Sequence, residues 1–165
     1  MRILGVDPGL CITGYGVIET GPRSFKLLEA GVIRTSAKEK IDARVAKIYE
    51  GLKSLVEEFK PEALVLEQLY SHYKHPTTAI LMGHARGVIC LLAKQYGIKL
   101  AGYSATRVKK AVTGAGHASK YQMQRMVQNI FNMRSVPDPA DIADALALAV
   151  AHVHMSGKEG IARIR

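Results

Sequence analysis

The sequence predicts an α/β protein in which helices flank a mixed β-sheet. Three strand-like segments come first, separated only by short turns, which is typical of an antiparallel meander. Helical and strand-like segments then alternate, which is typical of parallel strands joined by helices. With 165 residues, 48% of them hydrophobic, and no Pro/Gly/Ser-rich linker, the chain suits a single core. We therefore expect one domain over residues 1–155 and a basic, flexible tail over residues 156–165.

Five strands are expected from short apolar runs bounded by turn residues. The first run is closed by the turn sequence Asp7-Pro8-Gly9, and Gly21-Pro22 separates the second from the third. The later two runs each follow a helical segment. The predicted strands cover residues 2–6, 13–19, 25–35, 63–67 and 98–102.

Five helical segments are expected, of which the second is unusual. Residues 77–96 are apolar on nearly every side, so this helix needs cover on both faces. The sheet can cover one face, and a second subunit can cover the other; a monomer that buries the whole helix is the alternative. Helical spacing of apolar residues predicts the helices at residues 41–59, 77–96, 104–112, 119–131 and 139–155.

The charge of the chain favours a polyanionic partner. Lys and Arg number 23 against 14 Asp and Glu, for a formal charge of +9, which points first to nucleic acid; an ordinary basic surface is the alternative. Cys11 and Cys90 are too few for a disulfide framework. No signal-peptide pattern and no apolar run of about 18 residues is present, so we expect a cytoplasmic protein with no membrane partner.

Acidic residues stand at the ends of apolar runs that are far apart in the chain. Asp7 ends the run ILGVD and Glu67 ends ALVLE. If these runs are parallel neighbours, about 4.8 Å apart in a sheet, both carboxylates lie at the edge where open α/β sheets bind ligands. Each also has a structural explanation, because Asp7 can cap the turn that follows it and Glu67 can point to solvent.

Asp141 and Asp144 lie in the run DPADIADALALAVAH, which predicts a buried helix. Asp138 precedes Pro139 and suits the helix N-cap, and Asp141 can favour the helix dipole. Asp144 is harder to explain this way, because it lies among apolar residues where an unpaired carboxylate costs several kcal/mol. At a spacing of three it shares a helix face with Asp141.

Four carboxylates gathered at one place repel one another unless a cation lies between them. Mg²⁺ suits such a site, because it is a hard ion that takes carboxylate oxygens, keeps several waters and binds substrate phosphate. Two ions about 4 Å apart would activate a water and stabilise a leaving oxygen. We therefore expect two Mg²⁺ ions, with Mn²⁺ as a substitute, on Asp7, Glu67, Asp141 and Asp144.

Five motifs in order cover nearly the whole chain: GVDPGxxxTGYGV at residues 5–17, LEQ-L-Y at 66–70, GxARG at 83–87, GxGxASK at 114–120 and DIADALALAVAH at 141–152. With these motifs the chain resembles the RuvC family of bacterial Holliday junction resolvases, in the retroviral-integrase and ribonuclease H superfamily. The resemblance implies a ribonuclease H-like, five-stranded mixed sheet with helices on both faces, and a homodimer.

The same resemblance implies an activity. It implies Mg²⁺-dependent, paired nicking of two like-polarity strands at a four-way DNA junction, leaving 5′-phosphate and 3′-hydroxyl ends, and cooperation with the RuvA and RuvB branch-migration proteins. The family's catalytic acids fall on Asp7, Glu67, Asp141 and Asp144.

The resemblance also implies three DNA-binding residues. The family's junction-binding lysines fall on Lys109 and Lys120, and its stacking aromatic falls on Tyr70, where many relatives carry Phe. Stacking on a base is worth about 1–3 kcal/mol. An ordinary solvated basic face is the alternative for both lysines, with Ser119 as a helix N-cap beside Lys120.

Three other functions remain open from the sequence. A non-catalytic junction-binding module would keep the acids for folding, and ordinary ribonuclease H activity would differ in substrate. The segment DPGxxxTGYGV is also similar to the phosphate loop of actin-like and sugar kinases. Those proteins enclose nucleotide with a second lobe, which this chain is too short to supply.

Overall fold

The computed structural model describes residues 1–21, 24–68 and 76–156. Its centre is one five-stranded sheet with strand order β3-β2-β1-β4-β5. The pairs β1–β2 and β2–β3 are antiparallel, whereas β1–β4 and β4–β5 are parallel. The strands are β1 Arg2–Asp7, β2 Ile12–Thr20, β3 Phe25–Arg34, β4 Ala63–Glu67 and β5 Lys99–Tyr103. The predicted mixed sheet is confirmed, including the change from antiparallel to parallel pairing.

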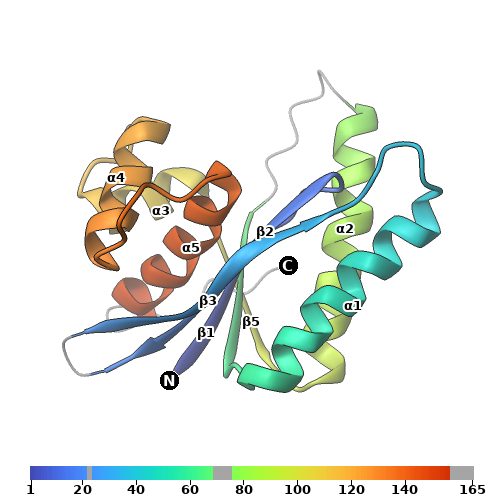
Figure 1. Cartoon of the computed structure of the whole chain (residues 1–165), viewed down its shortest axis with the longest axis horizontal. Helices are drawn as coiled ribbons and strands as arrows, with labels where there is room; N and C mark the ends of the chain where they lie inside the picture. Colours follow the sequence, from blue (N-terminus) through green and yellow to red (C-terminus); the bar gives the residue numbers. More distant parts are fainter. Residues whose placement is uncertain (22–23, 69–75, 157–165) are drawn as a thin grey trace.

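Helices cover both faces of this sheet. Helices α1 and α2 lie on one side, and α3, α4 and α5 lie on the other (Figure 1). The helices are α1 Ile41–Phe59, α2 Pro76–Gln95, α3 Ala105–Thr113, α4 Lys120–Ile130 and α5 Ala140–Ser156. Helix α5 includes Ser156, the first residue of the expected tail, and the rest of that tail lies outside the described residues. No helix in the described ranges is long and apolar enough to cross a membrane.

The alternation of side chains along β1 and β4 sorts them into two cores. Leu4, Val6, Leu64 and Leu66 point toward α1 and α2, whereas Ile3, Ala63 and Val65 point toward α3, α4 and α5. Successive residues of a strand face opposite sides. Asp7 and Glu67 therefore belong to the face that α5 covers.

Glycines in the central strands let α5 lie directly on the sheet backbone. A Cβ added at Gly5 would stand 2.0 Å from the Ala145 carbonyl oxygen, and one added at Gly16 would stand 2.5 Å from the Leu146 side chain. A larger residue at Gly5 would force the helix away, and one at Gly16 would displace the Leu146 side chain. The glycines of the motif GVDPGxxxTGYGV thus bring the last helix close to β1 and β2.

The structure corrects one detail expected from the sequence. Helix α5 begins at Ala140, so Asp138 lies one residue too early to be its N-cap. Pro139 takes the flanking position, and its carbonyl accepts a bond from the Ile142 amide at 3.1 Å. Gly114 ends α3 with a left-handed φ of 81°, a conformation that favours glycine.

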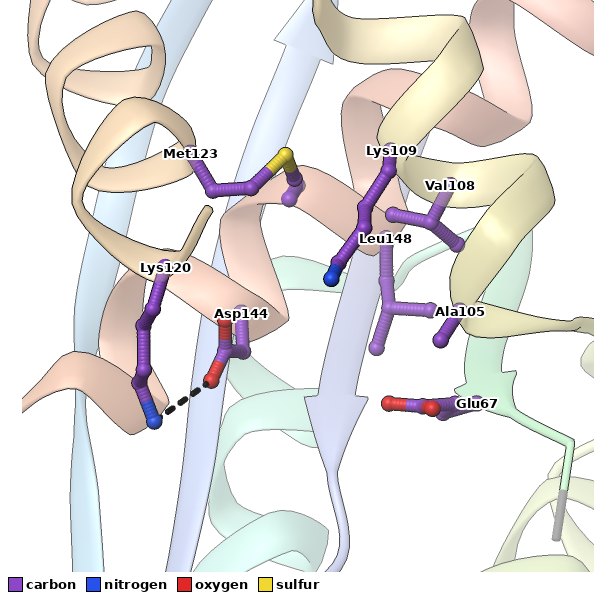
Figure 2. A pocket seen from close by; sticks show the side chains of 9 residues that line it. Glu67, Ala105, Val108, Lys109, Lys120, Met123, Asp144 and Leu148 are labelled. Carbon is purple, nitrogen blue, oxygen red and sulfur yellow. Dashed lines mark ion pairs between the residues drawn. The ribbon is translucent and has the colours of Figure 1, made fainter. Parts of the chain in front are cut away.

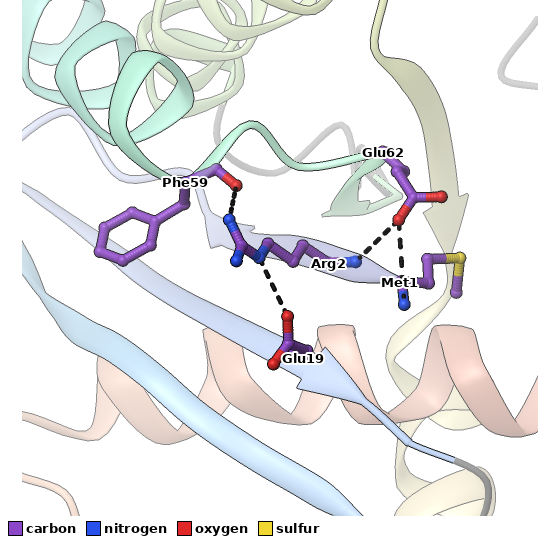
Figure 3. Close-up of polar contacts among 5 residues, drawn as sticks. All are labelled: Met1, Arg2, Glu19, Phe59 and Glu62. Atoms are coloured by element: carbon purple, nitrogen blue, oxygen red, sulfur yellow. Dashed lines mark hydrogen bonds and ion pairs between the residues drawn. The ribbon is translucent and has the colours of Figure 1, made fainter.

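Arg2 ties the start of β1 to its neighbours at the end of the sheet away from the acidic residues (Figure 3). Its Nε donates to Glu19 Oε1 at 3.1 Å, and Nη1 donates to the Phe59 carbonyl at 3.0 Å. Its backbone amide donates to Glu62 Oε1 at 3.1 Å. Exposed ion pairs contribute little stability by themselves, but these bonds hold β2 and the end of α1 in register with β1.

Helix α2 is buried on one face only. Ala85, Ile89, Leu92 and Ala93 pack in the core against α1 and the sheet. The opposite face carries Ile80, Gly83, Gly87 and Leu91, which we call the outer stripe. Ile80 is 63% exposed and Leu91 52% exposed, and a Cβ added at either glycine would meet nothing within 4 Å. We expected this helix to be covered on both faces, and among the described residues the outer stripe stays exposed.

Candidate active site

The sheet brings Asp7 and Glu67 together from sixty positions apart in the sequence. Strands β1 and β4 are parallel and paired from Ile3–Ala63 through Val6–Leu66. Asp7 and Glu67 each follow one residue later, at the carboxyl ends of their strands. Because the side chains of both residues point to the face that α5 covers, the two carboxylates lie side by side over the same edge. This is the arrangement that the apolar runs predict.

Helix α5 supplies the other two acids. Asp141 lies in its first turn, and Asp144 follows at a spacing of three on the same face. Gly14, paired with Asp7 across β1 and β2, makes this approach possible. A Cβ there would stand 2.2 Å from the Asp141 carbonyl oxygen and 3.0 Å from Asp141 Cβ.

The pKa of Asp7 indicates that the four carboxylates are close enough to repel one another. Burial raises the pKa of Asp7 from 3.8 to about 7, with a further contribution from the three other carboxylates. Burial also raises the pKa of Glu67, and the charge of Asp144 adds to that rise. The pKa of Asp144 rises mainly through burial, against the opposing charge of Lys120. Negative charge at this site is therefore costly without a cation.

Two lysines stand over the acids. Glu67, Asp144, Lys109 and Lys120 line one pocket, whose wall is completed by apolar side chains of α3, α4 and α5 (Figure 2). Lys120 Nζ lies 3.4 Å from Asp144 Oδ2, although the lysine side chain is 64% exposed. Lys109 extends from α3 toward the gap between Asp144 and Glu67. Both lysines can therefore contact an anion that reaches the carboxylates.

The Ser119 cap, which belonged to the alternative interpretation of Lys120, is present. Ser119 Oγ accepts from the Gln122 amide at 3.2 Å, while Gln122 Oε1 accepts from the Ser119 amide at 2.8 Å. This capping box starts α4 at Lys120, so the lysine is directed at the site by the helix start itself. Lys120 can therefore follow the Ser119 cap and still pair with Asp144.

The donor set fits a hard divalent cation. Carboxylate oxygens are the ligands that Mg²⁺ and Mn²⁺ prefer, and the raised pKa values of Asp7, Glu67 and Asp144 indicate that a positive charge is needed among them. Within the described ranges, no three Asp, Glu, His or Cys side chains lie close enough together to enclose a metal ion as they stand. Lys120 supplies a positive charge beside Asp144.

Sequence reasoning missed one residue at the site. Arg86 Nη1 donates to the backbone carbonyl of Glu67. The motif GxARG contains this arginine, but nothing in the sequence shows that α2 reaches the end of β4. Tyr70, the predicted stacking residue, lies outside the described residues.

The fold and the site together define the class of protein. A five-stranded mixed sheet with this strand order, and carboxylates on β1, β4 and the last helix, is a ribonuclease H-like nuclease architecture. The family model described as "Crossover junction endodeoxyribonuclease RuvC" matches residues 3–152. The chain belongs to the RuvC family.

Curated relatives agree with the family model. A crossover junction endodeoxyribonuclease RuvC from Rhodopirellula baltica is 50% identical over 149 residues, which cover 90% of this chain and 83% of the relative. A protein of the same name from Alkaliphilus metalliredigens is 38% identical over 165 residues and covers both chains completely.

Solved structures show the same fold. RuvC from T. thermophilus in complex with a Holliday junction substrate aligns with a TM-score of 0.89 at 32% identity, over 94% of each chain. The yeast mitochondrial Holliday junction resolvase Ydc2 aligns with a TM-score of 0.69 at 15% identity, over 94% of this chain and 78% of its own. At that identity Ydc2 supports the fold alone.

Proposed function

We propose that this chain is a Holliday junction resolvase, an endonuclease that nicks two like-polarity strands of a four-way DNA junction and leaves 5′-phosphate and 3′-hydroxyl ends. The observation that carries the proposal is the gathering of Asp7, Glu67, Asp141 and Asp144 at one edge of the sheet, beneath two lysines. Family membership and the junction-bound T. thermophilus relative support the same substrate. A non-catalytic module would have no need for four mutually repelling acids.

The four carboxylates would hold Mg²⁺, most simply as two ions, with Mn²⁺ able to substitute. Bound there, the ions would supply an activated water and a counter-charge for the leaving 3′-oxygen. The protein's own contribution is to hold the acids in place on β1, β4 and α5. Lys109 and Lys120 bind phosphate oxygens next to the scissile bond, and Tyr70 stacks on an unpaired base at the junction centre.

The active enzyme is a homodimer in this proposal. Two symmetric cuts across a junction require two sites related by a two-fold axis. The outer stripe of α2 supports a self-contact, because it is apolar and its glycines let another helix approach closely. By family membership, the dimer acts in the cytoplasm with the RuvA and RuvB branch-migration proteins.

The test is a synthetic four-way junction, labelled on each strand in turn and incubated with and without Mg²⁺. Wild-type protein is expected to make paired, symmetric nicks only with the ion. Asp7→Asn removes one ligand and should bind the junction without cutting it. Asp138→Asn makes the same chemical change at an exposed acid outside the site and should cut normally. Normal nicking by Asp7→Asn would overturn the proposed catalytic site.

A further inference from the structure

Arg86 connects helix α2 to the end of the strand that carries Glu67. The arginine lies mid-helix in α2, and its Nη1 donates to the Glu67 backbone carbonyl. A hydrogen bond from a charged donor is shorter and stronger than one between neutral groups. Nothing in the chemistry proposed above uses this residue, because it faces the backbone of Glu67 and lies outside the lining of the pocket.

This bond lies at the point where β4 ends. Glu67 is the last residue of β4, and the next amide, that of Gln68, donates to the Tyr103 carbonyl of β5 at 2.8 Å. The end of β4 is therefore fixed from the β5 side by one bond and from the α2 side by another. Without the arginine, the Glu67 peptide would be fixed from one side only.

Arg86 is not needed to hold α2 on the sheet. The buried apolar side chains of the inner face, among them Ala85 and Ile89, already pack the helix against the core. No acidic side chain pairs with the guanidinium among the ion pairs of the described residues. Its one hydrogen-bond acceptor there is the Glu67 carbonyl. A role directed at Glu67 explains the residue better than a role in packing.

We propose that Arg86 is a positioning residue for the metal site, and that it holds the Glu67 backbone so that the carboxylate would meet a cation bound among the acids. This inference rests on the proposed role of Glu67 as a metal ligand. Outer residues that orient a ligand typically change metal affinity or activity 10–100-fold when removed.

The experiment compares Arg86→Ala, Arg86→Lys and a control, Lys53→Ala, which removes a half-buried cation from α1, outside the site. For each variant, Mg²⁺ is titrated while the thermal unfolding midpoint is followed without DNA, and junction nicking is measured at each concentration. Arg86→Ala should need roughly 10–100-fold more Mg²⁺ for half-maximal stabilisation and nicking, with junction binding in EDTA unchanged. Arg86→Lys should recover most of the loss, because an ammonium can donate to the same carbonyl.

The outcomes separate this inference from the proposed function. A wild-type Mg²⁺ requirement in Arg86→Ala would overturn the positioning role. If Arg86→Ala does not fold, Arg86→Lys decides. A Mg²⁺ response close to that of wild type would support the positioning role, whereas a loss as large as that of Glu67→Gln would overturn it. If wild-type protein failed to nick junctions yet still gained stability from Mg²⁺, the proposed function would fail while the Mg²⁺ titrations still tested Arg86.

Discussion

Replacing Gly14 by alanine should damage the active site without touching any carboxylate. The new Cβ would stand 2.2 Å from the Asp141 carbonyl oxygen, where ordinary contacts begin at 3.4 Å. Because the obstacle is helix backbone, which cannot rotate away, α5 must withdraw from β2 by about 1 Å. A misplacement of about 1 Å can cost on the order of 100-fold in rate, equivalent to about 3 kcal/mol of transition-state stabilisation.

The assay is single-turnover nicking of a four-way junction at saturating Mg²⁺, alongside urea unfolding of the same protein. Gly14→Ala should cut about 100-fold more slowly and lose roughly 1–3 kcal/mol of unfolding free energy through overpacking. Junction binding should stay near that of wild type, since Lys109 and Lys120 lie on α3 and α4.

Gly51→Ala is the matched control. It adds the same methyl group on α1, where the Cβ would meet the flexible end of the Ile33 side chain, with Cδ1 at 2.7 Å. Alanine also favours a helix over glycine by about 1 kcal/mol, so cutting should be unchanged. If Gly14→Ala nicked at the wild-type rate, the close packing of α5 on β2 would not set the geometry of the acids.

Three further predictions concern charge and assembly. In EDTA, the unfolding free energy should fall by roughly a few kcal/mol as pH rises from about 4 to about 7. The reason is that folded Asp7, with a pKa of about 7, keeps a proton that the unfolded chain releases near 3.8. Urea unfolding of Asp7→Asn should show a much flatter dependence on pH. Lys109→Ala should weaken junction binding and reduce the slope of log affinity against log salt by about 1, and a gel-shift titration that returned the wild-type slope would contradict the phosphate contact. Leu91→Glu should convert a dimer into a monomer by light scattering and abolish paired cuts, whereas a persistent dimer would exclude the outer stripe as the interface.

The sequence was sufficient for the sheet and for the meeting of the acids because both depend on local patterns. Apolar runs located β1 and β4, and the carboxyl-end rule for parallel strands placed Asp7 beside Glu67. Asp144 was identifiable because a carboxylate among the apolar residues of a buried helix is costly unless a positive charge pairs with it. These inferences require only the periods of strands and helices.

Other features depend on how elements pack, which no local pattern records. The pairing of Lys120 with Asp144 follows from the seating of α4 on α5, through buried residues such as Met123 and Val127. The bond from Arg86 follows from the path of α2 across the sheet. The Asp138 cap was wrong for a local reason, because α5 starts only after Pro139.

Helix α2 has two opposite sides with very different neighbours. One side bears Ile80 and Leu91 toward solvent, while Arg86 reaches the strand that ends in Glu67. If two subunits pair through the outer stripe as proposed, a tilt of this helix on association would reach Glu67, the proposed metal ligand, through the Arg86 guanidinium. A lone subunit would then be a poorer cutter than a paired one, which would protect DNA from unmatched breaks.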